Sequence, residues 1–567
     1  MKRNRIVSML VACSLLAGCL AGCGEGAVQS GSAASRPLTD MTVPDLTASA
    51  APEQLYDLNT LSASTAQSAP RLTGAVNVVL SDSSITVDGE PVSTDPTAEV
   101  YAARDIVYYE AGHDFTYGEG TAADAHTRDE ADAHTVVHIT QPGMYRLQGK
   151  LTAGQIAVDL GENAKNDPNA VVTLVLDGLD ISCTVAPAII FYNVYECGSA
   201  SVATATRDVD TTTAGARVVI ADGSENTVNG SYVARIYKPG TVVLDEDGTE
   251  VEDAKKLHKY DAAFYSRMSM NLYGGAQNTG VLTINAENEG LGSELHLTIH
   301  GGRIHITSGN DGINTNEDEV SVTAIHGGLV DITVTGTTGE GDGIDSNGWL
   351  VINGGMVLAS ACGFSGDAGI DSDRGIWLNG GVVAASGNML DHIAGGAAPY
   401  AVFQFAGSRK GGQTYRLAAA DGSTVAGAVP ANDCSILILS TPQMTDGEYT
   451  LWCGQTRLAH STADGFGSLG GFGGQRPQGS YDREFPDDFD PDDFEFEWDD
   501  DWDEGRRDDR HPAANPGSAP QSPQGGNPPN GGRPGQGDAD RQADGALTDV
   551  FAISGVQNRF SGVREAG

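Results

Sequence analysis

Pairs of glycines recur at a nearly constant spacing and constrain the fold more than any other feature of the chain. The pairs begin at Gly274, Gly301, Gly327, Gly354 and Gly380, so successive pairs are 26 or 27 residues apart. A fixed repeat of this length is typical of solenoids, propellers and repeat arrays. Each repeat holds only two or three short strands, fewer than a propeller blade needs, and the leucine ladder of leucine-rich repeats is absent. The spacing therefore predicts an all-β chain built as a parallel β-helix, with one coil per repeat.

Alternating side chains within a repeat predict which residues face the interior. In "ELHLTIHGGRIHITSG", which runs from Glu294 to Gly309, every second residue of each strand is apolar. Side chains of a strand point alternately to opposite faces. Gly-Gly between the two strands allows a corner without a side-chain clash. We expect an inner face of Leu295, Leu297, Ile299, Ile304 and Ile306, and an outer face of Glu294, His296, Thr298, His300, Arg303, His305 and Thr307.

A second turn of each coil carries acids and amides. The aligned turns read "EGLGSE" (289–294), "DGINTN" (311–316), "DGIDSN" (342–347) and "AGIDSD" (368–373). Their apolar third positions would stack inside, and Asn314, Asp345 and Asp371 would stack outside at the strand spacing of about 4.8 Å. Carboxylates this close repel unless they are hydrated, protonated or bridged by a cation. Such hard oxygen ligands suit Ca²⁺, and a hydrated ladder of Asx turns is the alternative.

The two ends of the chain differ in composition from the repeats. Basic residues and an apolar run at residues 1–23 predict a lipoprotein signal, with "LAGC" occurring twice. We expect the lipid on Cys23, with Cys19 as the alternative, and a flexible tether over 24–75. This predicts a protein at the bacterial cell surface, attached to the outer face of the membrane through the lipid anchor only.

The remaining boundaries follow from where strand alternation stops and resumes. We expect a β-helix domain over 76–396 and an antiparallel β cap over 397–460. A disordered insertion rich in Gly, Pro and acids is predicted over 461–545, because it cannot bury enough surface to offset chain entropy. The segment 546–567 turns apolar again, and we expect it to return and pair with the cap.

Charge and cysteine content narrow the function further. The formal net charge of −43 argues against a nucleic-acid partner, whose phosphates need a basic surface. Five cysteines follow the signal without metal-type spacing. Cys183 with Cys197 and Cys434 with Cys453 could form disulfides, which would leave Cys362 as a buried thiol. The acidic segment 109–134, with three histidines, is interpreted as a solvated loop, with a metal site as the alternative.

Several motifs together resemble a known family. These are "HITQPGMYRLQGKLTAGQIAVDL", "YDAAFYSRMSMNLYGG" and the successive "SGNDGINTNED", "GEGDGIDSNGWLVINGG" and "GDAGIDSDRGIWLNGG". They resemble bacterial carbohydrate-binding proteins with a calcium-binding, polysaccharide-lyase-like parallel β-helix, over about residues 75–388. The resemblance implies a right-handed helix, bound Ca²⁺ and affinity for cellulose-like or acidic plant glycans. Carried over by position, the Ca²⁺ ligands would be Asp311, Asn314, Asp342, Asp345, Asp367, Asp371 and Asp373. Ala368 departs from the pattern where Asp311 and Asp342 stand.

The sequence favours a binding protein over an enzyme. A pectate-lyase-type reaction needs Ca²⁺ and a Lys or Arg base, yet no Lys lies between Lys259 and Lys410. A lyase and a purely structural surface protein remain the alternatives, and no catalytic residue is assigned. Trp349 and Trp377 hold nearly matching coil positions and could stack on sugar rings, or pack against the neighbouring coil. We expect a monomer that binds polysaccharide.

Overall fold

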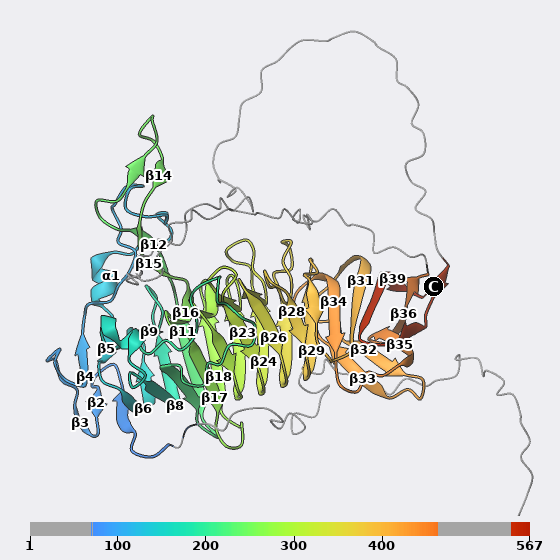
Figure 1. Ribbon diagram of the computed structural model, residues 1–567, viewed down its shortest axis with the longest axis horizontal. Helices are drawn as coiled ribbons and strands as arrows, with labels where there is room; N and C mark the ends of the chain where they lie inside the picture. The colour runs from blue at the N-terminus through green and yellow to red at the C-terminus, as the bar shows by residue number, and fades with distance from the viewer. Residues whose placement is uncertain (1–69, 71, 463–545, 567) are drawn as a thin grey trace, which may run out of the picture. The chain divides into compact units, whose positions relative to one another are not determined.

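The computed structural model describes residue 70, residues 72–462 and residues 546–566, and these are almost entirely β-structure (Figure 1). The predicted all-β class is confirmed. The predicted signal with Cys19 and Cys23 lies outside the described residues, as does most of the predicted tether and insertion. No helix among the described ranges is both long and apolar enough to cross a membrane.

Three ladders of parallel strands make up the repeats. The first ladder contains β1 (Val76–Leu80), β6 (Gly143–Leu151), β8 (Val172–Ser182), β10 (Ala216–Ile220), β17 (Met270–Gly274), β20 (Leu297–Ile299), β23 (Val322–Ile325), β26 (Trp349–Ile352), β28 (Ile376–Leu378) and β30 (Ile393–Gly395). The second continues from β8 through β11 (Glu225–Gly230), β18 (Val281–Ala286), β21 (Arg303–Ser308), β24 (Leu329–Val334), β27 (Met356–Ser360) and β29 (Val382–Gly387). The third contains β5 (Thr135–Ile139), β7 (Gly154–Asp159), β9 (Ile189–Asn193), β16 (Ala262–Ser266), β19 (Glu289–Ser293), β22 (Ile313–Thr315) and β25 (Ile344–Ser346).

The chain visits the ladders in a fixed order, so equivalent residues of successive coils lie on one another. From β18 to β27 it passes through the second, third and first ladder in turn, and β18, β21, β24 and β27 pair in parallel without a register shift. The expected inner residues Leu295, Leu297, Ile299, Ile304 and Ile306 are all buried. This stacking of apolar side chains forms one continuous core, which is the main source of stability in such an array.

Antiparallel strands and small elements border the ladders. β4 (Val100–Ala103) pairs antiparallel with β5, and β2 (Thr86–Val87) lies between β1 and β3 (Glu90–Pro91). The helix α1 (Arg128–Asp132) has a capping box at Thr127 and Glu130, and the 3₁₀ helix η4 (Glu162–Asn166) follows β7. A separate arm consists of β12 (Val233–Tyr237), β13 (Val243–Leu244), β14 (Val251–Asp253) and β15 (Lys256–Tyr260).

The last described strands are mostly antiparallel. They are β31 (Tyr400–Arg409), β32 (Tyr415–Ala419), β33 (Thr424–Ala428), β34 (Cys434–Ser440), β35 (Gly447–Cys453), β36 (Thr456–Ser461), β37 (Leu547–Thr548), β38 (Phe551–Ile553) and β39 (Gln557–Glu565). β34 pairs antiparallel with both β29 and β31, so it joins this group to the second ladder. The segment 546–566 pairs with this group of strands. β37 pairs with β36, β38 pairs with β35, and β39 lies parallel to β31. A second apolar core fills this part of the chain, around Phe403, Phe551 and Phe560.

All five described cysteines are free thiols, so neither disulfide that the spacing allowed is present. Cys183 is buried among core residues, and the Cys453 thiol contacts the Gln413 side chain at 3.5 Å. Cys362 is buried, as expected. Burial raises the pKa of Cys183 and of Cys434 to about 12, which keeps both thiols protonated and unreactive at neutral pH.

The outward face of the first ladder departs from the expected pattern. His296, Thr298 and His300 were expected to face solvent, but each is at most 5% exposed. Residues 196–211 cover this face: the Thr211 and Thr298 hydroxyls lie 2.7 Å apart, and a Cβ at Gly198 would lie 2.5 Å from the His296 ring. The expectation was wrong because the covering segment is nearly 90 residues away in the sequence and has no strand pattern.

Glycine at the corners is required by the stacking of coils. Gly302, Gly328, Gly355 and Gly381 all have positive φ, between 77° and 97°. A Cβ at Gly355 would lie 2.8 Å from the carbonyl carbon of Gly327 in the preceding coil. Both the conformation and the close backbone approach therefore exclude a side chain here.

We predict that Gly355→Ala lowers the free energy of unfolding by about 2 kcal/mol or more, because it adds left-handed backbone strain and a clash with backbone that cannot move aside. Thermal unfolding followed by circular dichroism measures the effect. Gly407→Ala is the control, since a Cβ there meets nothing within 4 Å and no positive φ is involved. Equal stability of the two variants would contradict the stacked-corner explanation.

The covered histidines predict a pH dependence of stability. His300 stacks between Tyr273 and His326, with ring centroids 4.5 Å and 5.4 Å away. Burial, aided by His326, lowers the pKa of His300 to about 4, and burial does the same for His296. In the unfolded chain these rings take up protons near pH 6.5. The unfolded state therefore binds more protons between pH 6.5 and 4, and stability falls as the pH drops through that window.

We expect His300→Gln to reduce this acid-induced loss of stability by about 2 kcal/mol between pH 7 and pH 4.5. Melting temperatures at a series of pH values measure it. His126→Gln, at a partly exposed position outside the stack, should leave the loss unchanged. An identical pH profile in the wild type and His300→Gln would show that the stack is not responsible.

Candidate functional site

The acidic turns lie on the third ladder, and each turn stacks on the next. Asn314 of β22 pairs with Asp345 of β25 in parallel register, and Ile313 pairs with Ile344 beneath them. The next turn continues the stack, since the Asp371 N–H donates to the Ile344 carbonyl at 2.7 Å. The pairing of these strands thus has the register that the alignment of the four turn sequences predicts. The row of Asn314, Asp345 and Asp371 is therefore present in the structure.

Three of the candidate carboxylates converge. One oxygen each from Asp342, Asp345 and Asp371 lie within 4.8 Å of one another, and all three side chains are partly buried. Burial first, then the negative charges of Asp371 and Asp311, raise the pKa of Asp342 well above its ordinary value. Holding such a group ionised needs positive charge close by, because the carboxylates repel one another strongly at these distances.

Asp311 links the convergent group to the preceding coil. Its Oδ1 accepts the Asp342 N–H at 2.7 Å, and the Asp342 carboxylate accepts the Ala368 N–H at 2.5 Å. Burial, and then the charges of Asp345 and Glu289, raise the pKa of Asp311 well above its usual range. Backbone donors therefore fix the orientation of both side chains but do not remove the excess negative charge.

Asn314 and Glu289, which lie in the coils before the convergent group, each have a buried side-chain oxygen without a hydrogen-bond partner. Asn314 donates through Nδ2 to Glu289 Oε1 at 3.0 Å and to Asp311 Oδ2 at 3.5 Å, which leaves Asn314 Oδ1 unsatisfied. Glu289 Oε2 is unsatisfied too. Glu289 is 4% and Asn314 8% exposed, so these acceptors are cut off from bulk water. An unsatisfied buried acceptor is costly, and a cation bound beside such an atom would satisfy it.

These donors fit a hard divalent cation. Ca²⁺ takes six to eight oxygen ligands at about 2.3–2.6 Å from carboxylates, amide oxygens and water. Asp342, Asp345 and Asp371 would supply the charge, and Asn314, whose Oδ1 is unsatisfied, lies in the coil that pairs with the coil of Asp345. Softer metals are disfavoured, because the group contains no thiol or imidazole.

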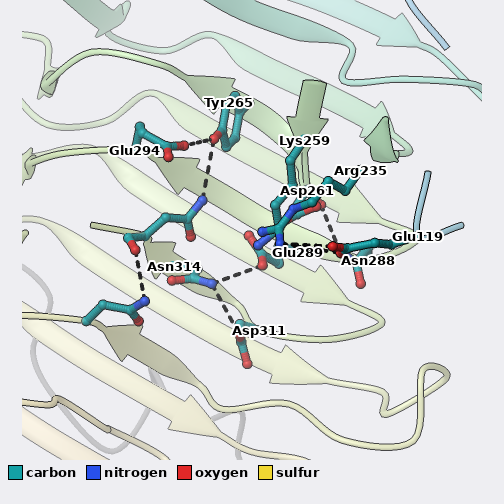
Figure 2. Close-up of polar contacts among 12 residues, drawn as sticks. Glu119, Arg235, Lys259, Asp261, Tyr265, Asn288, Glu289, Glu294, Asp311 and Asn314 are labelled. Atoms are coloured by element: carbon teal, nitrogen blue, oxygen red, sulfur yellow. Dashed lines mark hydrogen bonds and ion pairs between the residues drawn. The ribbon is translucent and has the colours of Figure 1, made fainter. Parts of the chain in front are cut away.

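At the end of the row that comes first in the sequence, a basic side chain, Lys259, lies beside the carboxylates. Figure 2 shows Lys259 against Asp261, next to Glu289, with the ammonium 2.9 Å from Asp261 Oδ2. Burial and Asp261 raise the pKa of Glu289 to about 8, while Lys259 acts in the opposite direction. Arg235 lies nearby and pairs with Glu119 at 3.4 Å.

Sequence reasoning missed this basic end. Glu289 stands at the first position of its aligned turn, where Asp311 and Asp342 stand in theirs, and this signal was available. Asp261 and Lys259 precede the repeats and could be placed only from the register of β16 on β19.

Asp367 and Asp373 are not among the three carboxylates that converge. Asp367 Oδ2 accepts the Gly341 N–H at 2.7 Å and a hydrogen bond from Ser365, so backbone and hydroxyl donors already engage it. Asp373 is exposed, and its N–H donates to the Ser346 carbonyl at 3.1 Å.

The two tryptophans do not form a common row. Trp377 lies opposite Val351 in the first ladder, two residues away from the position of Trp349. A guanidinium covers part of each ring: Arg374 Cζ lies 4.4 Å from the Trp349 centroid, and Arg207 Cζ lies 3.8 Å from that of Trp377. Trp377 also packs over Gly395, where a Cβ would lie 2.6 Å from the ring. Each indole is therefore partly exposed but contacts protein groups.

We predict that Lys259→Met destabilises the chain by about 1–3 kcal/mol, because it leaves the nearly buried Asp261 carboxylate without its counter-charge. Chemical denaturation at pH 7.5 measures the effect. The double variant Lys259→Met with Asp261→Asn should recover most of the loss, since the unpaired charge is gone. If the double variant is as unstable as the two single changes combined, the ion pair is not the cause.

Comparisons with known proteins agree with the glycan-binding expectation. A family model described as "Carbohydrate-binding domain-containing protein" matches residues 133–451. A protein from Acetivibrio thermocellus with the same description is 31% identical over 171 residues, which are 30% of this chain and 44% of the relative. The match thus spans less than half of that relative.

A solved structure was also found. It is described as the polysaccharide lyase-like protein from C. thermocellum in a gadolinium derivative, with 20% identity and a TM-score of 0.31, covering 57% of this chain and 92% of the other. A TM-score of this size does not establish a shared fold.

Proposed function

The chain belongs to the family of carbohydrate-binding domain-containing proteins, and from this premise we propose that it is a calcium-dependent polysaccharide-binding protein of the bacterial cell surface. The observation that carries the proposal is the family match over residues 133–451. This range contains the acidic row, by which we mean the stacked acidic and amide side chains from Asp261 to Asp371. Cellulose-like or acidic plant glycans are the proposed ligands.

Calcium is proposed to bind where Asp342, Asp345 and Asp371 converge. The ion would supply positive charge to carboxylates that are held together by the coil register and cannot separate. The unsatisfied Asn314 Oδ1 supports this assignment, since it is a buried acceptor in the coil that pairs with the coil of Asp345. Asp311 would act by orienting the Asp342 backbone, and Asp367 by fixing Gly341. Asp373 is proposed as an outer, more hydrated ligand.

We propose that the three ladders wind as a right-handed parallel β-helix. The fixed order of ladders along the chain and the unshifted parallel pairing between coils support this, and crossover connections between parallel strands are almost always right-handed. Surface attachment through Cys23, or Cys19, is proposed from the N-terminal sequence alone.

The tryptophans remain proposed sugar contacts. Arg374 covers one face of Trp349 and Arg207 covers one face of Trp377, so a sugar ring would have to use an uncovered edge or displace the guanidinium.

A lyase reaction is the alternative, and Lys259 suits it poorly. A lyase base must be deprotonated to remove the proton next to the uronate. The negative charge of Asp261 raises the pKa of Lys259, so the Lys259 side chain stays an ammonium at neutral pH. We therefore favour binding without turnover.

We expect binding to polygalacturonate in a pull-down assay that is lost with EDTA and restored by CaCl₂. Asp345→Asn should weaken Ca²⁺ binding at least about tenfold, as measured by isothermal titration calorimetry without glycan, because it removes a charged ligand. Asp331→Asn is the matched control, since Asp331 lies on β24 and pairs with His305 at 3.2 Å.

Other outcomes would contradict the calcium assignment or the binding function. Polygalacturonate retention that is unaffected by EDTA, together with no calorimetric Ca²⁺ signal, would overturn the calcium assignment. Unsaturated uronide products absorbing in the ultraviolet would replace the binding function with a lyase. A structural surface protein would bind no glycan in either condition.

A further inference from the structure

An open pocket lies beside the arm, formed by residues that the acidic row does not use. Its volume is about 680 Å³, within the range typical of small-molecule sites. One wall comes from the segment 112–117, part of the acidic segment that the sequence predicted to be a solvated loop, with a metal site as the alternative. The other wall comes from residues 236–242 and from Leu257 and His258 of β15.

The two walls are fixed to one another. The Tyr237 N–H donates to the Tyr117 carbonyl, and the Glu119 N–H donates to the Arg235 carbonyl, both at 2.9 Å. A Cβ at Gly118 would lie 2.2 Å from the Arg235 carbonyl oxygen, so the two chain segments touch backbone to backbone. The pocket is therefore largely pre-formed, and a ligand would not have to order its walls.

Flat rings and polar edges line this pocket. Tyr117, Tyr237, His113 and His258 all contribute to the lining. His113 and Tyr117 stack with centroids 3.9 Å apart and an angle of 15° between the planes. Leu257, 38% exposed, adds apolar surface. Rings with hydroxyl and imidazole edges present an apolar face and hydrogen-bonding rims, the combination that a sugar ring offers in return.

The charges of the pocket nearly cancel. Lys238 supplies one positive charge, and hydrogen bonds from Thr116 lower the pKa of Asp114, so that it supplies one negative charge. Burial, with Arg267 nearby, lowers the pKa of His258 and favours the neutral ring. A pocket for uronates would need an excess of positive charge, which these side chains do not provide.

We propose that this pocket binds an uncharged saccharide, and that it is a second glycan site, separate from the acidic row. The proposal rests on the proposed polysaccharide-binding function and names one ligand class and one location for it. The aromatic rings would stack on the sugar, and Lys238 and Asp114 would bond its hydroxyls. Because no carboxylate of the acidic row lines it, binding here should not require Ca²⁺.

The test is calorimetric titration of the full chain with cellohexaose in EDTA. We expect Tyr117→Ala to weaken binding at least about tenfold, because it removes a stacking ring. Leu257→Glu, a change at an exposed position that places charge in the pocket, should do the same without affecting folding. Phe364→Ala, at an aromatic residue that is 70% exposed and lies outside the pocket, should bind as the wild type does.

The outcomes separate this site from the calcium-dependent one. Unchanged cellohexaose affinity in both Tyr117→Ala and Leu257→Glu would overturn the pocket, as would affinity that disappears in EDTA or with Asp345→Asn. Tighter binding of hexagalacturonate than of cellohexaose at the pocket would overturn the uncharged ligand. Loss of polygalacturonate retention in EDTA with cellohexaose binding intact supports both sites, whereas no binding of any glycan overturns both.

Discussion

The parallel hydrogen-bonded stacking of one coil on the next is the constraint on which the rest of the structure depends. It places each residue about 4.8 Å from its equivalent in the neighbouring coil and permits little displacement. For Ile313 and Ile344 this arrangement is favourable, because it joins apolar side chains into one core. For Asp345 and Asp371 it is unfavourable, because it holds like charges together. For Gly328 and Gly355 it leaves no room for a side chain.

Stacking concentrates negative charge in the acidic row, and the two ends of the row differ in how this charge is balanced. At Asp261 and Glu289 the chain supplies its own ammonium from Lys259. Around Asp342 the neighbours that most affect its pKa are themselves carboxylates. The same backbone geometry thus gives an internally compensated end and an end suited to an external cation. The difference between the two ends is the basic side chain of Lys259, which lies beside the carboxylates of the first end.

What the sequence predicts well is whatever repeats with the coil. The glycine corners, the inner apolar residues and the alignment of the four acidic turns all follow from periodicity, and the structure has them. Features formed by non-repeating segments were missed. The burial of His300 requires residues 196–211, and the pocket requires Tyr117 to meet Tyr237, 120 positions later. Trp349 and Trp377 fall out of line because the second coil has two more residues between its turn aspartate and its tryptophan.

The described chain leaves the fold at Thr462 and re-enters it at Ala546, and these two residues are directly bonded. The Thr462 N–H donates to the Ala546 carbonyl at 2.9 Å, and β36 continues into pairing with β37 and β39. The strands on the two sides of this junction are thereby joined directly by main-chain hydrogen bonds. In general, doubling the length of a loop that is closed at such a junction costs only about 0.6 kcal/mol in closure entropy. This point is therefore where the chain can gain or lose sequence, or accept a foreign domain, while every ladder keeps its register.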